Sequence, residues 1–143
     1  MQKRALGLTG LNVVPIGFGG IPIQRLEQSQ VTAIVKQLAK EGLNFIDTAR
    51  GYTTSEEMIG EALKECRRED FILATKSMSR DYVGMKNDIE TSLRNLNTDA
   101  IDLYQCHLVK DLSQYTQIMS EEGAYKALME AKAEGKIRHI GIT

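Results

Sequence analysis

Hydrophobic residues along this chain alternate between short continuous runs and stripes with helical spacing. The run Val13 to Gly19 is bounded by turn residues, which is typical of a buried strand. The apolar residues that follow lie at the i, i+3, i+4, i+7 and i+8 positions of a helix: Val31, Ile34, Val35, Leu38 and Ala39. Gly42 occupies a position where a glycine commonly ends a helix. This pattern predicts one strand followed by one helix.

The same unit repeats along the rest of the chain. Further strands are predicted over Leu43 to Ile46, Phe71 to Thr75, Ile101 to Tyr104 and Ile137 to Ile142. Helices are predicted between them, over stripes from Met58 to Leu63 and from Met85 to Leu96, and over Glu121 to Glu134, where Gly135 ends the helix. Thr54 and Glu57 have the spacing of a capping box at the start of the first of these helices. Before the first unit, Arg4 to Val14 is expected to form a small hairpin.

Strict alternation of strands and helices implies βαβ crossovers, and therefore parallel strands with helices packed outside them. The strands are continuous apolar runs, which predicts a sheet covered on both faces. An open sheet that binds a dinucleotide requires G-x-G-x-x-G after its first strand. The segment Gly17-Phe18-Gly19-Gly20-Ile21-Pro22 has a proline in place of the third glycine. A closed barrel predicts instead that reactive side chains lie at the C-terminal ends of consecutive strands.

Composition narrows the possible partners. The 143 residues are 42% hydrophobic, enough for one core, and no Pro-rich or Ser-rich linker divides residues 1–143 into domains. The net charge is −1 and the densest charge run, Lys64 to Asp70, mixes both signs, which argues against nucleic acid as a partner. Cys66 and Cys106 lack zinc-site spacing, so we expect reduced, buried thiols and no metal. No signal-peptide core and no run of about 20 apolar residues is present, so we expect a cytoplasmic protein that does not cross a membrane.

Four polar side chains follow the predicted strands. Asp47 comes directly after the second strand, Lys76 after the third and His107 after the fourth, and Tyr52 lies in the loop after the second. Each of them taken alone could be a turn residue, a solvated lysine, a packed histidine or a loop aromatic. Because the C-terminal ends of parallel strands share one rim, we expect these side chains to lie together.

The chemistry of these side chains suits proton transfer to an oxygen atom. A phenol is mostly protonated at neutral pH, and it becomes an effective proton donor when a neighbouring ammonium group stabilises the phenolate. A carboxylate can hold that ammonium group in place, and an imidazole can orient a carbonyl oxygen and stabilise charge that develops on it. The set contains no source of hydride, so a reduction requires a cofactor.

With these residues in place, the chain resembles the aldo/keto reductase family. The resemblance extends over nearly the whole chain. It is carried by Gly17-Phe18-Gly19-Gly20, Asp47-Thr48-Ala49-Arg50-Gly51-Tyr52, Ser55 to Leu63, Ala74-Thr75-Lys76, Ile101 to His107 and Gly135 to Gly141. It implies an α/β fold, the TIM-type (β/α)8 barrel with a hairpin closing its bottom. It also implies hydride transfer between NADPH (NADP) and a carbonyl or alcohol.

The resemblance also implies roles for individual residues. Tyr52 would be the general acid, Lys76 and Asp47 its tuning pair, and His107 the group that orients the carbonyl. Gly20, Ile21 and Asp47 would lie near the nicotinamide end of the cofactor. Some similar members carry an iron-sulfur segment near the C-terminus. The chain has no such cysteine cluster, so an iron-sulfur cluster is expected only if a further C-terminal segment carries one.

A complete barrel needs about 250 residues, and this chain reaches Thr143 at its fifth strand. We therefore expect the N-terminal part of a barrel, with about five parallel strands, and an NADPH-dependent reductase of a small-molecule carbonyl that binds its cofactor weakly in this form. The alternative is a non-catalytic half-barrel that associates with itself or a partner through its open sheet edges. The segment Leu108 to Ser120 is expected to be a substrate-side loop or short helix, or an ordinary connection.

Overall fold

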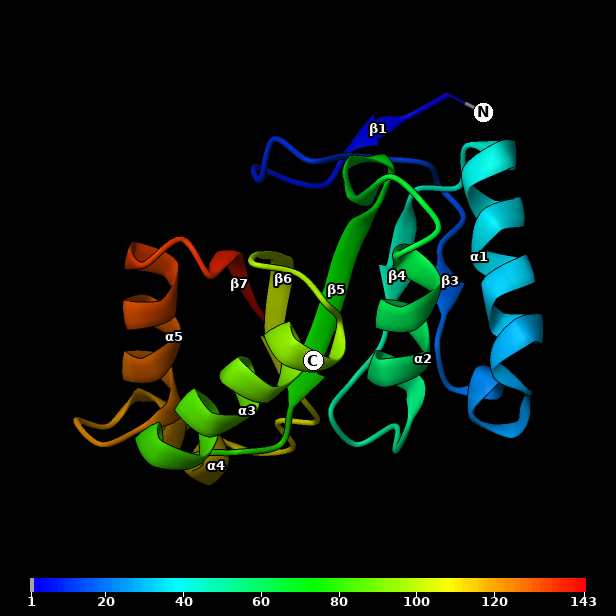
Figure 1. The fold of residues 1–143 in the computed structure, drawn as a ribbon. Coiled ribbons are helices and arrows are strands. Elements are labelled where there is room, and N and C mark those ends of the chain that lie inside the picture. Colours follow the sequence, from blue (N-terminus) through cyan, green and yellow to red (C-terminus); the bar gives the residue numbers. More distant parts are fainter. Residues whose placement is uncertain (1) are drawn as a thin grey trace.

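Parallel strands form the sheet at the centre of the computed structural model, which describes residues 2–143 (Figure 1). Five strands lie side by side in the order of the sequence: β3 (Phe18–Gly19), β4 (Phe45–Asp47), β5 (Ile72–Ser77), β6 (Ile101–Cys106) and β7 (Ile137–Ile142). Every neighbouring pair is parallel. Their C-terminal ends therefore lie at one end of the sheet, as the alternating pattern predicted.

The predicted N-terminal hairpin is present and lies at the opposite end. Strands β1 (Arg4–Ala5) and β2 (Asn12–Val13) pair in antiparallel fashion. Asn44, the residue before β4, accepts a hydrogen bond from the Val14 N–H at 3.0 Å and donates one to the Asn12 carbonyl at 2.8 Å. These bonds hold the hairpin against the N-terminal ends of the strands (Figure 1).

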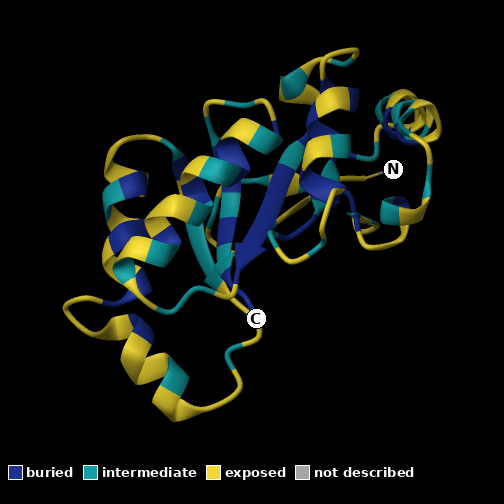
Figure 2. Ribbon diagram, turned by 60° about the horizontal axis from the view of Figure 1, so that its bottom comes forward, coloured by how far each residue is buried: buried dark blue, intermediate teal, exposed yellow. Residues whose placement is uncertain are grey.

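Helices alternate with the strands. They are α1 (Gln28–Glu41), α2 (Ser55–Leu63), α3 (Tyr82–Asn95), α4 (Leu112–Met119) and α5 (Ala124–Ala133), with short 3-10 turns η1 (Pro22–Arg25) and η2 (Arg68–Asp70). The predicted glycine stops are confirmed, because Gly42 and Gly135 have the left-handed φ values of 70° and 77°. Helix α4 shows that residues 108–120 contain a short helix, most of it exposed (Figure 2).

The helices α1, α2, α3 and α5 lie along one face of the sheet (Figure 1). Ile46, Leu73 and Tyr104 face these helices, and each is at most 1% exposed. Phe45, Ile72 and Leu103 alternate with them along the strands, so they belong to the opposite face, and they are only half-buried. The prediction that both faces are covered is therefore wrong for residues 2–143: these three side chains leave the second face partly open.

Two local predictions are also wrong. The run Val13 to Gly19 does not form one strand, because Val13 pairs in the hairpin while only Phe18 and Gly19 join the main sheet. Pro15 lies between the two and has no N–H to donate to a ladder. Thr54 precedes α2, but its backbone is already helical and its side chain makes no cap hydrogen bond. Its hydroxyl lies 3.5 Å from the Met58 sulfur instead.

Close packing of α2 against the end of α3 gives a testable prediction. A Cβ at Gly60 would lie 2.0 Å from the Asn95 carbonyl oxygen, a backbone atom that cannot move aside cheaply. Gly60→Ala should therefore lower the free energy of unfolding by about 1–3 kcal/mol or more, measured by urea unfolding followed by circular dichroism. Gly19→Ala is the matched control, since a Cβ at Gly19 meets no atom within 4 Å. Equal stability of the two variants would contradict this packing.

Candidate active site

The sequence-predicted site residues meet at the C-terminal end of the sheet. Asp47 ends β4, Lys76 lies near the end of β5 and His107 directly follows β6. The register places β4 beside β5 and β5 beside β6. Lys76 is 6% exposed, and its ammonium donates to Asp47 Oδ2 at 2.5 Å and to the Thr48 carbonyl at 2.9 Å. The ion pair thus joins two neighbouring strand ends.

The Tyr52 ring lies against both Lys76 and His107. Lys76 Nζ is 5.1 Å from the centroid of the Tyr52 ring, a distance at which an ammonium group attracts an aromatic face. The rings of Tyr52 and His107 meet edge to face, with centroids 5.9 Å apart and planes at 84°. All four predicted residues therefore lie in one cluster. Within it, the Lys76 ammonium lies against the Tyr52 ring and donates its hydrogen bonds to Asp47 and Thr48.

Hydrogen bonds to its backbone fix the position of His107. Its N–H donates to the Ser77 carbonyl at 2.8 Å, and its own carbonyl accepts from Arg80 Nη2 at 2.6 Å. The side chain is only 8% exposed, and its buried Nδ1 has no hydrogen-bond partner among the described residues. Burial and the Lys76 ammonium lower the pKa of His107, with Asp47 opposing them. The imidazole is therefore neutral at neutral pH, and one ring nitrogen can donate to an oxygen.

The loop that carries Tyr52 continues β4 along β5. The Thr48 N–H donates to the Ala74 carbonyl and the Arg50 N–H donates to the Lys76 carbonyl, both at 2.9 Å. The backbone then turns, and Thr53 adopts a φ of 38°, which is unusual for a β-branched residue. Leu108, directly after His107, also has a positive φ of 54°. Strained backbone is thus found next to two of the candidate residues, as is common at functional sites.

The end of β3 closes the site on the side of β4. The Gly20 N–H donates to the Asp47 carbonyl at 2.8 Å, and the Gly20 carbonyl accepts from Ser55 Oγ at 2.9 Å. A Cβ at Gly20 would lie 2.5 Å from Ser55 Oγ, so only glycine fits there without a shift. Ile21 follows and is exposed. Of the predicted cofactor-binding residues, Gly20 and Asp47 are in direct contact, and Ile21 extends from the same turn.

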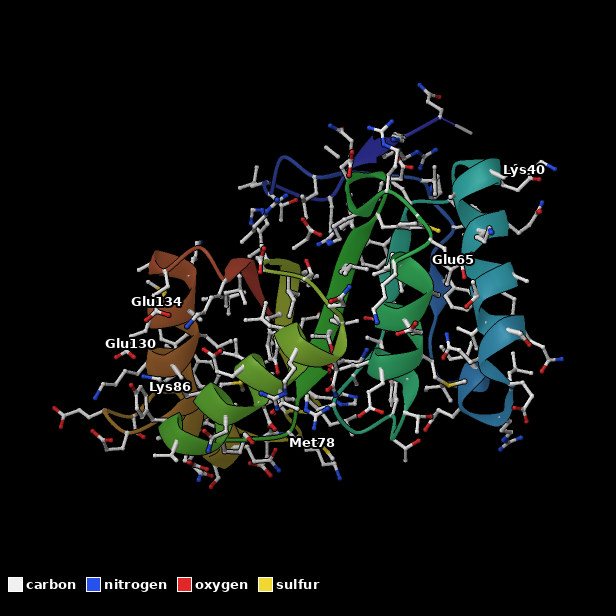
Figure 3. The ribbon with its side chains drawn as sticks, in the orientation of Figure 1. Lys40, Glu65, Met78, Lys86, Glu130 and Glu134 are labelled. Carbon is white, nitrogen blue, oxygen red and sulfur yellow. The ribbon has the colours of Figure 1, made fainter. Side chains whose placement is uncertain are left out.

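Two surface features adjoin the cluster. Met78, which follows β5, lies at the same end of the molecule (Figure 3), and its methyl group is 3.7 Å from the Cβ position of Gly51. An open, mainly apolar hollow of about 420 Å³ is lined by Gly17, Phe18, Gly19, Phe45 and Asp47 together with residues of the hairpin segment. This hollow reaches the Asp47 side of the cluster.

Sequence reasoning missed the charged residues that support the site. Arg50, Glu56, Arg80 and Asp88 lie on different elements, and no local periodicity marks them. Glu56 is 1% exposed although it stands in the first turn of α2, where an acidic residue is usually a solvent-exposed helix-start residue. Apart from the one to Arg50, its hydrogen bonds go to residues on other strands and helices. The signals in the sequence were the adjacent acidic pair Glu56-Glu57 and the place of Glu56 in the Ser55 to Leu63 segment.

Other predictions concern metals, thiols and membranes. Within residues 2–143, no group of three or more His, Cys, Asp and Glu side chains is placed to hold a metal ion. Cys66 is half-buried and Cys106 is buried, and neither forms a disulfide in the described part of the chain. No helix among the described residues is long and apolar enough to cross a membrane.

Comparison with known proteins shows which family this chain belongs to. The family model of the aldo/keto reductase family matches residues 15–143. The chain is 36% identical to L-galactose dehydrogenase of Arabidopsis thaliana over 159 aligned positions, which cover 100% of this chain and 48% of that protein. The chain thus spans about half the length of the curated relatives it matches.

Solved structures agree in fold. The holo form of an aldo-keto reductase from Bacillus halodurans superposes with a TM-score of 0.81 and 34% identity, covering 100% of this chain and 50% of that one. An aldo-keto reductase from Klebsiella pneumoniae in complex with NADPH superposes with a TM-score of 0.83 and 28% identity, covering 99% and 50%. The five-stranded sheet with its hairpin is therefore part of a TIM-type barrel, as the sequence predicted.

His107 predicts a pH dependence of stability. Because its pKa is lowered in the folded chain, the unfolded chain takes up this proton first as the pH falls below 6.5. The free energy of unfolding should then decrease, by at most about 1.4 kcal/mol per pH unit for this group. His107→Gln should flatten this part of the curve, measured by urea unfolding at a series of pH values. An unchanged slope in the variant would show that His107 is not the group responsible.

Proposed function

Because this chain belongs to the aldo/keto reductase family, we propose that it carries the catalytic end of an NADPH-dependent oxidoreductase that reduces a small-molecule aldehyde or ketone to an alcohol. Residues 1–143 then correspond to the N-terminal portion of the reductase barrel. The observation that supports this most directly is the convergence of Asp47, Tyr52, Lys76 and His107 at one end of the parallel sheet.

Each residue of the cluster has a role in moving one proton. Tyr52 donates its hydroxyl proton to the substrate oxygen as negative charge develops there. The Lys76 ammonium, held by Asp47 Oδ2 at 2.5 Å, stabilises the phenolate that remains. His107, neutral and buried, donates a hydrogen bond to the same oxygen and orients the carbonyl.

NADPH would supply the hydride when bound. Gly20, Ile21 and Asp47 are the residues of this chain that would hold its nicotinamide end. Asp47 and the neighbouring Gly19 line the open, mainly apolar hollow, and a Cβ at Gly19 would meet no atom within 4 Å, so this surface fits a flat, uncharged ring. The NADPH complex of the Klebsiella pneumoniae relative supports the choice of cofactor.

The proposal is tested by NADPH binding and turnover. Titration of the chain with NADPH should give saturable cofactor fluorescence, and a small aldehyde such as methylglyoxal should cause NADPH to be consumed. Tyr52→Phe should reduce turnover by about 100-fold or more, because the proton donor is lost, while binding stays nearly unchanged.

The matched control is Tyr115→Phe, which removes the hydroxyl of an exposed tyrosine on α4. It should leave turnover unaltered. Turnover in Tyr52→Phe equal to that of the unmodified chain would refute the assigned acid, and a chain that neither binds nor consumes NADPH would refute the reductase proposal.

A second candidate function is self-association through a sheet edge. Strand β7 has six residues without proline and pairs with only one neighbour, β6, among the described residues. Strand β3 at the other edge has only two residues and lies between Pro15 and Pro22, which protects it from pairing. We infer that a second copy of the chain would pair along β7.

This edge pairing predicts a dimer that a single charge disrupts. Ile142 is 54% exposed near the end of β7, and Ile142→Lys should shift the chain toward the monomer in size-exclusion chromatography with light scattering. Leu112→Lys, at an exposed apolar residue on α4, should leave the dimer intact. A concentration-independent monomer before any substitution would exclude this second function.

A further inference from the structure

The guanidinium of Arg50 lies between two carboxylates from two different helices. Its Nη1 is 2.7 Å from Glu56 Oε2 on α2, and its Nε is 3.6 Å from Asp88 Oδ1 on α3. Burial opposes the charge, but the hydrogen bond and charge of Glu56 together with the charge of Asp88 raise the pKa of Arg50. Arg50 is therefore a permanent cation at the junction of α2, α3 and the loop that carries Tyr52.

Both carboxylates accept hydrogen bonds from β5, from the residues on either side of Lys76. Glu56 accepts a hydrogen bond from Thr75 Oγ1 at 2.7 Å. Asp88 accepts one from the Ser77 hydroxyl. Between them, the Lys76 carbonyl accepts the Arg50 backbone N–H at 2.9 Å. Arg50 is thus connected, directly or through one carboxylate, to three consecutive residues of the strand that carries the ammonium group.

Glu56 and Asp88 are themselves held in place by further bonds. Glu56 Oε1 also accepts from Ser92 Oγ at 2.7 Å, and Asp88 Oδ2 also accepts from Ser79 Oγ at 2.7 Å. A carboxylate with several fixed donors has little freedom to follow a moving arginine. The two acids therefore determine where the Arg50 side chain can lie.

Arg50 stands two residues before Tyr52, and the Tyr52 N–H closes the intervening turn on the Ala49 carbonyl at 3.0 Å. Movement of Arg50 would therefore move the Tyr52 ring relative to Lys76 and His107. We propose that Arg50, held by Glu56 and Asp88, is a positioning residue that places the Tyr52 ring over the Lys76 ammonium and against the His107 ring. Its effect on catalysis rests on the proposed function, but its effect on geometry does not.

Arginine suits this role because its planar fork presents Nε and Nη atoms in two directions at once. A lysine could neutralise Glu56, but it would offer one compact charge and would not also place a second charged nitrogen 3.6 Å from Asp88. Arg50→Lys therefore distinguishes two roles of Arg50: positioning the Tyr52 ring, and only neutralising the buried Glu56.

The experiment compares Arg50→Ala and Arg50→Lys with the unmodified chain and with Arg68→Ala. Arg68 is the matched control: it is 30% exposed, and its Nη2 lies 2.8 Å from Asp102, an acid 3% exposed near the start of β6. Two quantities are measured, the nuclear Overhauser contact between the Tyr52 and His107 rings without cofactor, and NADPH turnover. Circular dichroism reports whether each variant folds.

Arg50→Ala and Arg50→Lys should both lose the ring-to-ring contact, and turnover should fall by about 100-fold, the effect of misplacing a reacting group by 1 Å. Arg68→Ala should keep the contact and the turnover of the unmodified chain. If Arg50→Ala does not fold, Asp88→Asn, at a partly exposed acid, tests the same link and should weaken the contact.

Retention of the ring contact in Arg50→Lys would overturn the proposal, because neutralising Glu56 would then suffice. Loss of the contact in Arg68→Ala would overturn it as well, because general destabilisation would then explain the effect. An unmodified chain that shows the ring contact but no turnover would contradict the proposed function, and the comparison of ring contacts would still decide the role of Arg50.

Discussion

The Lys76 ammonium is the group on which the arrangement of this site depends. A charge that is 6% exposed would be costly without partners. Asp47 and the Thr48 carbonyl provide these partners from the neighbouring strand and its loop, so β4 and β5 must end side by side. The same charge lies against the Tyr52 ring and helps to lower the pKa of His107. One buried ammonium thus connects a carboxylate, a phenol and an imidazole.

At both ends of the sheet, a buried carboxylate binds groups from several strands, helices and loops. At the C-terminal end, the Glu56 carboxylate accepts hydrogen bonds from the Arg50 guanidinium and from hydroxyl groups on β5 and α3. At the N-terminal end, Asp102 is bound by Arg68 and Arg138 and accepts the Leu73 N–H at 2.9 Å. Removing one partner of such a pair leaves a buried charge uncompensated, which makes these pairs sensitive to mutation. These ion pairs therefore help to fix the alignment of neighbouring strands at both ends of the sheet.

The candidate active site and the open sheet edge lie on different parts of the molecule. The candidate active site is built on the ends of β3, β4, β5 and β6, while the open edge belongs to β7. Between these lies the partly open face with Phe45, Ile72 and Leu103, which is the inner face of the sheet in a barrel. The chain spans about half the length of the relatives it matches.

The sequence by itself determined the order of the elements, the glycine stops and the four candidate site residues. Helical stripes and apolar runs report local burial, and parallel strands place residues at consecutive strand ends on one rim whatever the details of packing. Only the tertiary structure decided that the run from Val13 to Gly19 is divided between two sheets, that Thr54 makes no cap, and that one face of the sheet stays partly open. It alone also assembled Arg50, Glu56 and Asp88. Their partners lie on other elements of the chain, and a hydrogen bond between distant residues leaves no periodic trace in the sequence.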